Sequence, residues 1–500
     1  MRRFVWLLAL SNTALSAAVI RGTIVENRTG KPLSRASVVL VPIAGTPGSQ
    51  VAARTNNFGG FEFQSLTGGS YVLKASRRGF LPLEYGQKQW NSAGQPIALA
   101  EDASAFLNLR LMRYGGITGT ILDENDIGML DHEVVAYRNT VPPELVARGK
   151  SDDRGMYRIS GLEPGVYLVR TTGTQDEQIS YVPTFSKETQ QRETARTVQV
   201  FLDEDSIGMD IRPAPGRLLT ISGKAEPSEP CPVEVTVTLA SDLGRSTQTV
   251  PCVFQFGSLP PGAYELYAEA PEVPGVVKYQ GAYTQVTLIK DDVTVSMMKQ
   301  DVRPTRFDFG GVASGPSNPM QVTARRKDLA GVGPAALLKL TNNSALLAPG
   351  RWEVSLLPPP GYYVSGFYGP GFGRPRSRPD GWNEFLSNGM GSSVRFTLSG
   401  GPAEMHGVVK SYGDPVVGAP VYLEAYDPET HTRLTDLRTV RTDIHGLYRF
   451  QGLAPGIYRV LATFEYQMPD TASMELAGAP SVRVEARSDL QMDLDLYGVR

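Results

Sequence analysis

One short phrase recurs five times along the chain and constrains the fold more than any other feature. Its typical form is Leu-x-Pro-Gly-x followed by an aromatic residue, with Gly-Gly replacing Pro-Gly in the first copy. The aromatic residues that end the five copies are Tyr71, Tyr167, Tyr264, Trp352 and Tyr458. Their spacing of about 100 residues is the size of one small domain. The phrase therefore predicts a tandem array of domains, not a single large core.

The residues after each phrase alternate between apolar and polar, with the period of two that is typical of a half-buried strand. In the third copy Tyr264 and Leu266 are expected to point inward and Glu265 outward. The fourth and fifth copies repeat this pattern, with Glu353 and Arg459 as the outward residues. These three charged side chains are therefore predicted to lie on outer sheet faces.

Two further features recur upstream of the phrase. An Asn or Asp followed by glycine supplies a turn, in segments that begin at Asn57, Asp153 and Asp443. Every unit except the fourth opens with a strand that carries a glycine, namely Gly22, Gly119, Gly223 and Gly407. Short alternating strands separated by turns, in a unit of about 100 residues, predict a β-sandwich. The 52 glycines and 37 prolines agree with a turn-rich β-protein.

The predicted fold class is all-β, with about five tandem antiparallel β-sandwiches in an elongated array. We call them modules 1 to 5, with predicted boundaries at residues 19–113, 114–213, 214–300, 301–400 and 401–500. No long Ser- or Pro-rich linker separates them, so neighbours are expected to abut. Modules 1 and 4 carry net positive charge and the other three net negative charge, which favours fixed contacts where opposite signs meet.

Residues 1–18 are typical of a secretory signal peptide. Arg2 and Arg3 precede an apolar run, and small residues up to Ala18 suit cleavage. The alternative is a buried first strand. No later stretch has the uninterrupted apolar length of a membrane span. We therefore expect an exported chain, located in the periplasm, on the outer surface or in the medium.

Module 5 resembles the carboxypeptidase regulatory-like domain, a prealbumin-like, Ig-like β-sandwich. The residues that carry the resemblance are Val408–Val409, Gly418–Leu423, Thr442–Asp443, Gly446–Phe450 and Leu453–Tyr458. Module 2 is similar at nearly the same positions and module 1 in part, whereas modules 3 and 4 lack the Asp-x-x-Gly turn. Such domains are accessory: they follow peptidase domains, precede outer-membrane receptor barrels or form tandem arrays in secreted bacterial proteins. The resemblance implies a carbohydrate-binding-like fold and supplies no catalytic residue.

Composition argues against an enzyme. Four histidines and two cysteines give few ligands for zinc or iron, and neither a His-Glu-x-x-His nor a Gly-x-Ser-x-Gly motif is present. The balance of 49 basic and 51 acidic residues gives no reason to expect nucleic acid. We expect no cofactor and no metal, with the histidines at surface or turn positions. The acidic stretches 123–126 and 202–205 could ligate calcium, but solvated turns explain them better.

Both cysteines, Cys231 and Cys252, lie in module 3 on either side of a predicted hairpin. An exported location favours a disulfide between them. The alternative is two free thiols.

Candidate binding residues lie in two aromatic loops. In module 1, Tyr85 and Trp90 stand among amides and carboxylates, a mixture that suits a sugar. In module 4 the candidates are Tyr362, Tyr368 and Trp382 with Arg374 and Arg376, which suit an anionic glycan or an acidic protein surface. The alternative is that the aromatic residues belong to cores and edge strands and the arginines to a solvated rim.

Two functions are compatible with these features. The first is a non-catalytic exported protein that binds polysaccharide or another cell-envelope component. The alternative is a structural spacer or adaptor whose partner is an envelope protein. The oligomeric state is left open.

Overall fold

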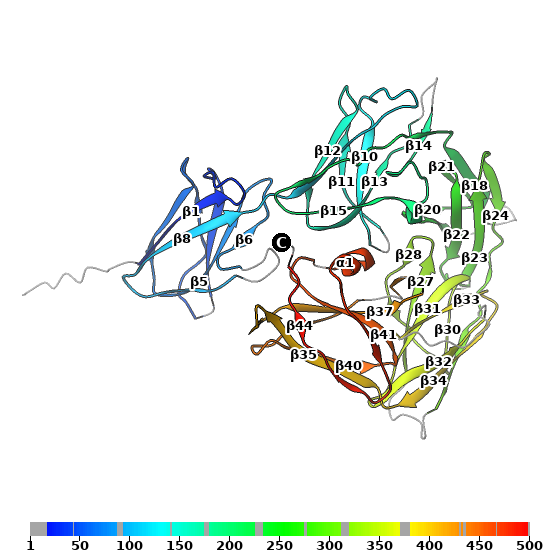
Figure 1. Ribbon diagram of the computed structural model, residues 1–500. Coiled ribbons are helices and arrows are strands. Elements are labelled where there is room, and N and C mark those ends of the chain that lie inside the picture. Colours follow the sequence, from blue (N-terminus) through cyan, green and yellow to red (C-terminus); the bar gives the residue numbers. More distant parts are fainter. Residues whose placement is uncertain are drawn as a thin grey trace, which may run out of the picture. The chain divides into compact units, whose positions relative to one another are not determined.

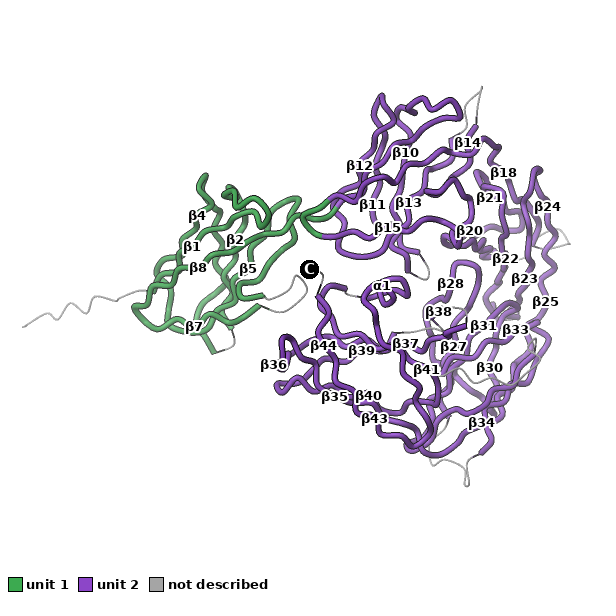
Figure 2. The backbone as a smooth tube through the Cα atoms, viewed as in Figure 1, with its two compact units in different colours: residues 1–115, 202–204 green, residues 116–201, 205–500 purple. Residues whose placement is uncertain are grey.

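The structure is a computed structural model that describes residues 18–498 except 44, 88–93, 141–142, 175–179, 226–233, 275–277, 312–319, 371–380, 430–431, 434–436 and 467. The described residues form tandem β-sandwiches, as predicted (Figure 1). They fall into two compact units, residues 1–115 with 202–204 and residues 116–201 with 205–500 (Figure 2). The predicted boundaries of the modules remain a prediction, and the module names are kept for the corresponding strands.

The strands of modules 1 and 2 form pairs of larger sheets. Module 1 has sheets of order β4-β1-β8 and β3-β2-β5-β6, with β7 paired to β5. Its strands are β1 (Ala18–Glu26), β2 (Ser37–Pro42), β3 (Val51–Arg54), β4 (Gly60–Leu66), β5 (Gly69–Ser76), β6 (Leu83–Glu84), β7 (Ile97–Leu99) and β8 (Ser104–Leu111). Module 2 has sheets β12-β9-β16, β11-β10-β13-β15 and β14-β17. Its elements are β9 (Gly115–Thr120), β10 (Glu133–Arg138), β11 (Glu144–Lys150), β12 (Met156–Leu162), β13 (Gly165–Thr171), β14 (Tyr181–Val182), the 3-10 turn η1 (Arg192–Thr194), β15 (Thr197–Val200), β16 (Asp205–Ser206) and β17 (Ala214–Pro215).

Modules 3 and 4 repeat the two-sheet plan. Module 3 has sheets β21-β18-β24 and β20-β19-β22-β23-β25. Its strands are β18 (Leu219–Lys224), β19 (Val235–Ser241), β20 (Gly244–Val250), β21 (Val253–Leu259), β22 (Gly262–Ala270), β23 (Gln280–Leu288), β24 (Val293–Ser296) and β25 (Gln300–Asp301). Module 4 has sheets β30-β26-β34-β32 and β28-β27-β31-β33, with β29 paired to β27. Its strands are β26 (Thr305–Gly310), β27 (Gln321–Asp328), β28 (Gly331–Val332), β29 (Ala336–Leu337), β30 (Ser344–Ala345), β31 (Gly350–Leu357), β32 (Tyr362–Tyr368), β33 (Trp382–Ser387) and β34 (Ser393–Gly400).

Module 5 adds a short helix to the same plan. Its sheets are β36-β35-β40, with β43 and β44 paired to β35, and β38-β37-β41-β42, with β39 paired to β37. Its elements are β35 (Ala403–Ser411), β36 (Asp414–Pro415), β37 (Pro420–Asp427), β38 (Thr432–Arg433), β39 (Arg438–Arg441), β40 (Leu447–Leu453), β41 (Gly456–Ala462), α1 (Thr471–Leu476), β42 (Ser481–Val484), β43 (Asp489–Gln491) and β44 (Leu494–Asp495). The side chain of Asp470 caps α1 by accepting a hydrogen bond from the backbone N–H of Ser473 at 2.7 Å. Because α1 contacts β13 of module 2, contacts within the second unit are not confined to sequential modules.

The repeated phrase has one structural role in all five modules. Its aromatic side chain donates a hydrogen bond to the backbone carbonyl four residues earlier, at 2.7–2.8 Å in every copy. Tyrosine hydroxyls donate in four modules, and in module 4 the indole N–H of Trp352 takes their place. The ring thereby enters the core while its polar atom holds the turn that precedes the strand.

Each module also closes with a parallel pair that the sequence analysis did not predict. The opening strand pairs with a strand near the module's end, as in β1 with β8, β18 with β24 and β26 with β34. In modules 2 and 5 the partners are β9 with β16 and β35 with β43 and β44. The opening glycine fits this crowded position, since a Cβ on Gly22 would lie 2.1 Å from the carbonyl oxygen of Leu107 and 2.6 Å from the ring of Phe61.

The predicted turns form one residue earlier than expected in modules 1 and 2. The side chains of Asn56, Asp152 and Asp443 accept hydrogen bonds from the backbone N–H groups two and four residues later, at 2.8–3.0 Å. A glycine three residues after each of them takes a positive φ, for example 72° at Gly59. The side-chain oxygen thus replaces a backbone acceptor in a tight turn.

The three charged residues predicted on outer faces do point away from the cores, but they are buried. The exposed fractions are 1% for Glu265, 0% for Glu353 and 3% for Arg459. In module 5 the segment around α1 covers this face, because Arg459 pairs with the fully buried Glu424 and donates to the carbonyl of Thr471 at 3.4 Å. The period-two alternation was correct, but the expectation of half-buried strands was wrong here because other segments cover the outer face.

Candidate ligand-binding site

In module 1 one of the two predicted binding residues, Tyr85, takes part in the packing of the module itself. Tyr85 is partly buried against the module's core, and Trp90 lies outside the described residues. Beside Tyr85, Glu84 pairs with Lys74 at 2.8 Å, and this hydrogen-bonded pair lowers the pKa of Glu84. The described part of the loop therefore presents no open aromatic platform.

The module 4 candidates separate into different environments. Tyr362 and Tyr368 lie at the two ends of β32, Tyr362 half-buried against the core and Tyr368 51% exposed. Arg374 and Arg376 lie outside the described residues. The predicted grouping of these arginines with the two tyrosines therefore remains a prediction.

Trp382 is not an open loop residue. It begins β33, is only 8% exposed, and the guanidinium carbon of Arg325 lies 3.9 Å from the centroid of its ring. Arg325 is itself held by a buried ion pair with Glu353 at 2.7 Å. The indole is therefore fixed from one side by a cation–π contact.

Trp382 also lines a cavity of about 470 Å³ between the sheets of modules 4 and 5. Module 4 contributes β27, β31, β32 and β33, and module 5 contributes β37, β39, β40 and β41. Aromatic side chains and short polar ones share the lining, namely Tyr363, Trp382, Tyr458, Gln321, Thr323 and Ser355. This volume and this mixture are typical of a small-molecule site, for which volumes of about 300–1,000 Å³ are usual.

One charged residue, Arg438 on β39, stands among the described residues that line this cavity. Its guanidinium donates to the backbone carbonyl of Gln451 at 2.8 Å and lies 5.8 Å from the ring centroid of Phe450. Partial desolvation of the guanidinium lowers the pKa of Arg438, although the residue as a whole is exposed. The cavity thus combines apolar surfaces with a single positive charge.

The junction between modules 3 and 4 has the opposite character, since charged side chains fill it. Arg245 of β20 donates two hydrogen bonds to Asp328 at the end of β27, at 2.7 and 2.8 Å. The side chain of Asp328 is 1% exposed and also accepts from the Tyr267 hydroxyl at 3.3 Å. Nearby, Arg326 pairs with Glu269 and stacks on Tyr267 at 4.0 Å.

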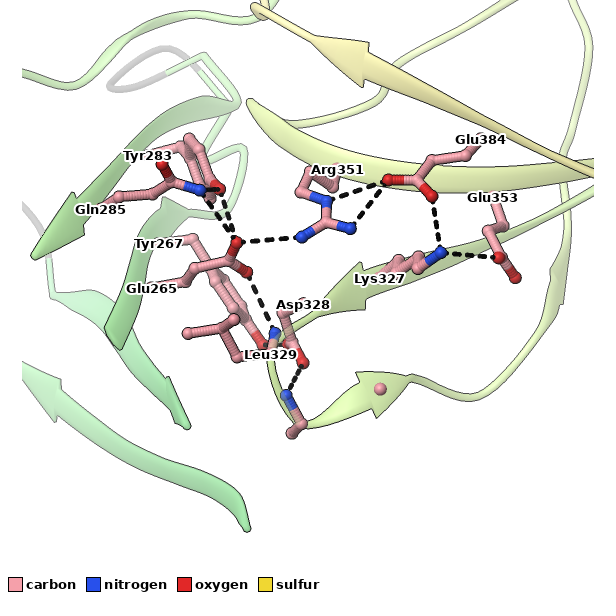
Figure 3. Close-up of polar contacts among 12 residues, drawn as sticks. Glu265, Tyr267, Tyr283, Gln285, Lys327, Asp328, Leu329, Arg351, Glu353 and Glu384 are labelled. Carbon is pink, nitrogen blue, oxygen red and sulfur yellow. Dashed lines mark hydrogen bonds and ion pairs between the residues drawn. The ribbon is translucent and has the colours of Figure 1, made fainter. Parts of the chain in front are cut away.

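A second chain of polar contacts crosses the same junction (Figure 3). Glu265 of module 3 accepts hydrogen bonds from the Tyr283 hydroxyl at 3.0 Å, from Arg351 at 3.3 Å and from the backbone N–H of Leu329 at 3.2 Å. Arg351 continues to Glu384 at 2.9 Å, and Glu384 accepts from Lys327 at 2.6 Å. These contacts supply the complementary charge that the net signs of modules 3 and 4 favoured.

The remaining sequence candidates are accounted for within the modules. Cys252 is buried and Cys231 lies outside the described residues, so their disulfide stays a prediction. His132 is 4% exposed and packs edge-on against Tyr181, which corrects the expected surface position; burial lowers its pKa. His445 lies in its predicted turn. The Nδ1 atom of His406 lies 3.0 Å from a carboxylate oxygen of Asp489, and His431 lies outside the described residues.

Neither acidic stretch forms a metal centre. Asp123 caps its own turn, Asp203 accepts from the backbone N–H of Arg113 at 2.7 Å, and Asp205 pairs with Arg158 at 2.9 Å. Across the part of the chain that the structure describes, no group of three or more His, Cys, Asp or Glu side chains is placed to hold a metal ion. No helix of that part is long and apolar enough to cross a membrane.

A protein-family comparison matches residues 19–111 to the carboxypeptidase regulatory-like domain. Module 1 is similar to this family. The match falls on the module where the sequence resemblance was only partial, while the resemblance of modules 2 and 5 remains a prediction. No curated protein matches the chain.

Solved structures give distant likenesses. The minor pilin of Streptococcus agalactiae is 15% identical, with 40% of this chain and 97% of the pilin covered at a TM-score of 0.25. The pilus adhesin SpaC of Lactobacillus rhamnosus GG is 11% identical, with 73% and 56% covered at a TM-score of 0.16. A candidate carbohydrate-binding protein of Bacteroides uniformis is 11% identical, with 55% and 98% covered at a TM-score of 0.16. Similarity this low carries no argument about activity or ligand.

Proposed function

We propose that this chain is a non-catalytic, exported binding protein that holds a carbohydrate in the cavity between modules 4 and 5. The observation that carries the proposal is the lining of the cavity. Tyr363 and Trp382 offer ring surfaces on which the apolar C–H face of a sugar can stack, and Gln321, Thr323 and Ser355 offer partners for its hydroxyls.

The polar lining is available to a ligand. The side chains of Gln321, Thr323 and Ser355 form no hydrogen bond with any other described residue, and Gln321 is exposed. A ligand hydroxyl can therefore bind these groups without breaking an internal hydrogen bond.

The test uses residues 18–500, because Ala18 is fully buried in β1 opposite Leu66. Binding of neutral and acidic plant, microbial and host polysaccharides is measured on an array and then by calorimetry. Tyr363→Ala removes a cavity-lining ring, and Tyr368→Ala removes an exposed ring from the same strand that does not line the cavity. We expect Tyr363→Ala to weaken binding by about tenfold, or about 1.4 kcal/mol, because the variant removes a ring on which the sugar would stack.

Melting temperatures of both variants show whether a lost affinity reflects a lost fold. Loss of binding in Tyr368→Ala alone would move the site to the exposed ring of Tyr368, one of the residues that the sequence predicted. An array with no saturable binding would contradict the carbohydrate proposal.

A second candidate, a spacer or adaptor at the cell envelope, is favoured by the charged junction between modules 3 and 4. A junction that fixes two neighbours in one arrangement suits a rigid support. In that case an envelope protein should co-purify with the chain, and the Tyr363→Ala variant should retain it.

A further inference from the structure

We propose that the cavity between modules 4 and 5 recognises an acidic sugar, with Arg438 binding the carboxylate of a uronic acid. This inference rests on the proposed function of the cavity and specifies its ligand class. Arg438 is the specificity-determining residue, and Tyr363 and Trp382 contact the sugar ring.

Arg438 lines the cavity without a carboxylate partner among the described residues. It lies on β39. Among the described residues, its guanidinium donates one hydrogen bond, to the backbone carbonyl of Gln451 at 2.8 Å. A carbonyl accepts a hydrogen bond but does not neutralise the charge. The described residues form no ion pair with Arg438, in contrast to Arg433 and Arg459 of the same module, which both pair with Glu424.

The charge of the lining carries the second step. None of the described residues that line the cavity is acidic, so the positive charge of Arg438 faces apolar and neutral polar groups. An anion in the cavity would offset the partial loss of solvent around the guanidinium. A planar carboxylate matches the fork of a guanidinium in two parallel hydrogen bonds, which strengthens and orients the contact.

The aromatic residues restrict the class of possible ligands further. A simple inorganic anion would use Arg438 but not the rings of Tyr363 and Trp382 or the polar groups of Gln321 and Thr323. A uronic acid uses all of them, because one ring carries a carboxylate, several hydroxyls and an apolar face. The lining as a whole therefore points to a carboxylate attached to a sugar.

The experiment compares each acidic oligosaccharide with its methyl ester, which keeps the sugar and removes the charge. Oligomers of galacturonate, glucuronate and mannuronate are titrated into residues 18–500 by calorimetry. The variants are Arg438→Gln, Arg438→Lys and the matched control Arg441→Gln, on the same strand but outside the lining. Melting temperatures confirm that each variant is folded.

We expect at least one acid to bind about tenfold or more tightly than its ester, as charge-assisted hydrogen bonds do relative to neutral ones. Arg438→Gln should remove this preference, Arg438→Lys should keep part of it, and Arg441→Gln should leave it unchanged.

The outcomes separate this inference from the proposed function. Equal binding of acid and ester, or of neutral sugars alone, would overturn the acidic ligand and leave the carbohydrate site standing. An acid preference that survives Arg438→Gln would overturn the role of Arg438. Absence of binding by every sugar, acidic and neutral, would overturn both.

Discussion

The two junctions that module 4 makes with its neighbours are built in opposite ways. Towards module 3, Asp328 and Glu265 are almost fully buried and each accepts several hydrogen bonds from the other side. Towards module 5 there is a cavity of about 470 Å³ with Arg438 as the one charge among its described lining residues. At the junction with module 3, charged side chains pair with one another. At the junction with module 5, the cavity and the guanidinium of Arg438 are available to a ligand.

This difference teaches where stability and binding reside. Buried ion pairs carry a desolvation cost that only good geometry offsets, so a filled charged junction specifies one arrangement more than it adds stability. A cavity next to a fixed junction gains a constant shape, which lowers the entropy cost of binding. We therefore expect mutations at the first junction to change stability and mutations at the second to change affinity.

The largest effect should come from breaking the filled junction. Asp328→Ala removes the buried carboxylate to which Arg245 and the Tyr267 hydroxyl donate, and we expect a cost of about 1.5–3 kcal/mol, as for hydrogen bonds to a charged group. Calorimetric melting should show a lower transition for modules 3 and 4. The double variant Arg245→Met with Asp328→Leu should recover most of the loss, because neither charge is then left buried.

Arg438→Gln serves as the comparison at the cavity and should change stability by less than about 0.5 kcal/mol. An equal loss of stability in Asp328→Ala and Arg438→Gln would erase the distinction between the junctions.

Filling the cavity should affect binding without comparable damage to the fold. Ser355 is half-buried and lines the cavity, so Ser355→Trp places an indole where the ligand would lie. We expect sugar affinity to fall at least about tenfold, or 1.4 kcal/mol. Calorimetric titration measures this, with the exposed Ser365→Trp on β32 as control. Full affinity in Ser355→Trp would place the ligand elsewhere.

The sequence predicted the repeat and the sandwiches because both are local. Tyr71 and Tyr458 end equivalent phrases and make the same hydrogen bond to a carbonyl four residues earlier. The turn and the hydrogen bond that holds it are therefore both encoded within a few consecutive residues. The parallel pairs that close each module were not predicted, because the paired strands lie almost a whole module apart in the sequence, as β1 and β8 do.

The candidate site could be predicted only in part for the same reason. Trp382 was selected for its aromatic character, and it does line the cavity, although as a buried residue stacked on Arg325. No local sequence pattern identifies Arg438 as a binding residue, because the cavity that it lines is formed by strands of two modules. Glu353 likewise follows the alternation of an outer face, and only the segments that cover this face reveal that it is buried.

Salt should distinguish the two junctions with a smaller effect. Added salt screens exposed charges over about 10 Å at 0.1 M and less at higher concentration, whereas buried pairs are screened little. Affinity for an acidic sugar should fall severalfold between about 0.05 and 0.5 M salt, because Arg438 is partly exposed. The melting transition of modules 3 and 4 should shift little over this range. A salt-sensitive transition with a salt-insensitive affinity would reverse the assignment.

The smallest effect is expected in alkaline solution, at the filled junction. Burial, followed by the charge of Glu265, raises the pKa of Tyr283 to about 12. Because the tyrosine ionises near pH 10 in the unfolded chain, its contribution to stability is complete below that pH and is lost as pH rises towards 12. Denaturant unfolding between pH 8 and 11.5 should show a decline that is shallower in Tyr283→Phe. Tyr412→Phe, which alters a fully exposed tyrosine, should follow the parent chain. Identical slopes in all three proteins would mean that neither burial nor the contact with Glu265 raises the pKa of Tyr283, and that the contacts in Figure 3 are weaker than their distances indicate.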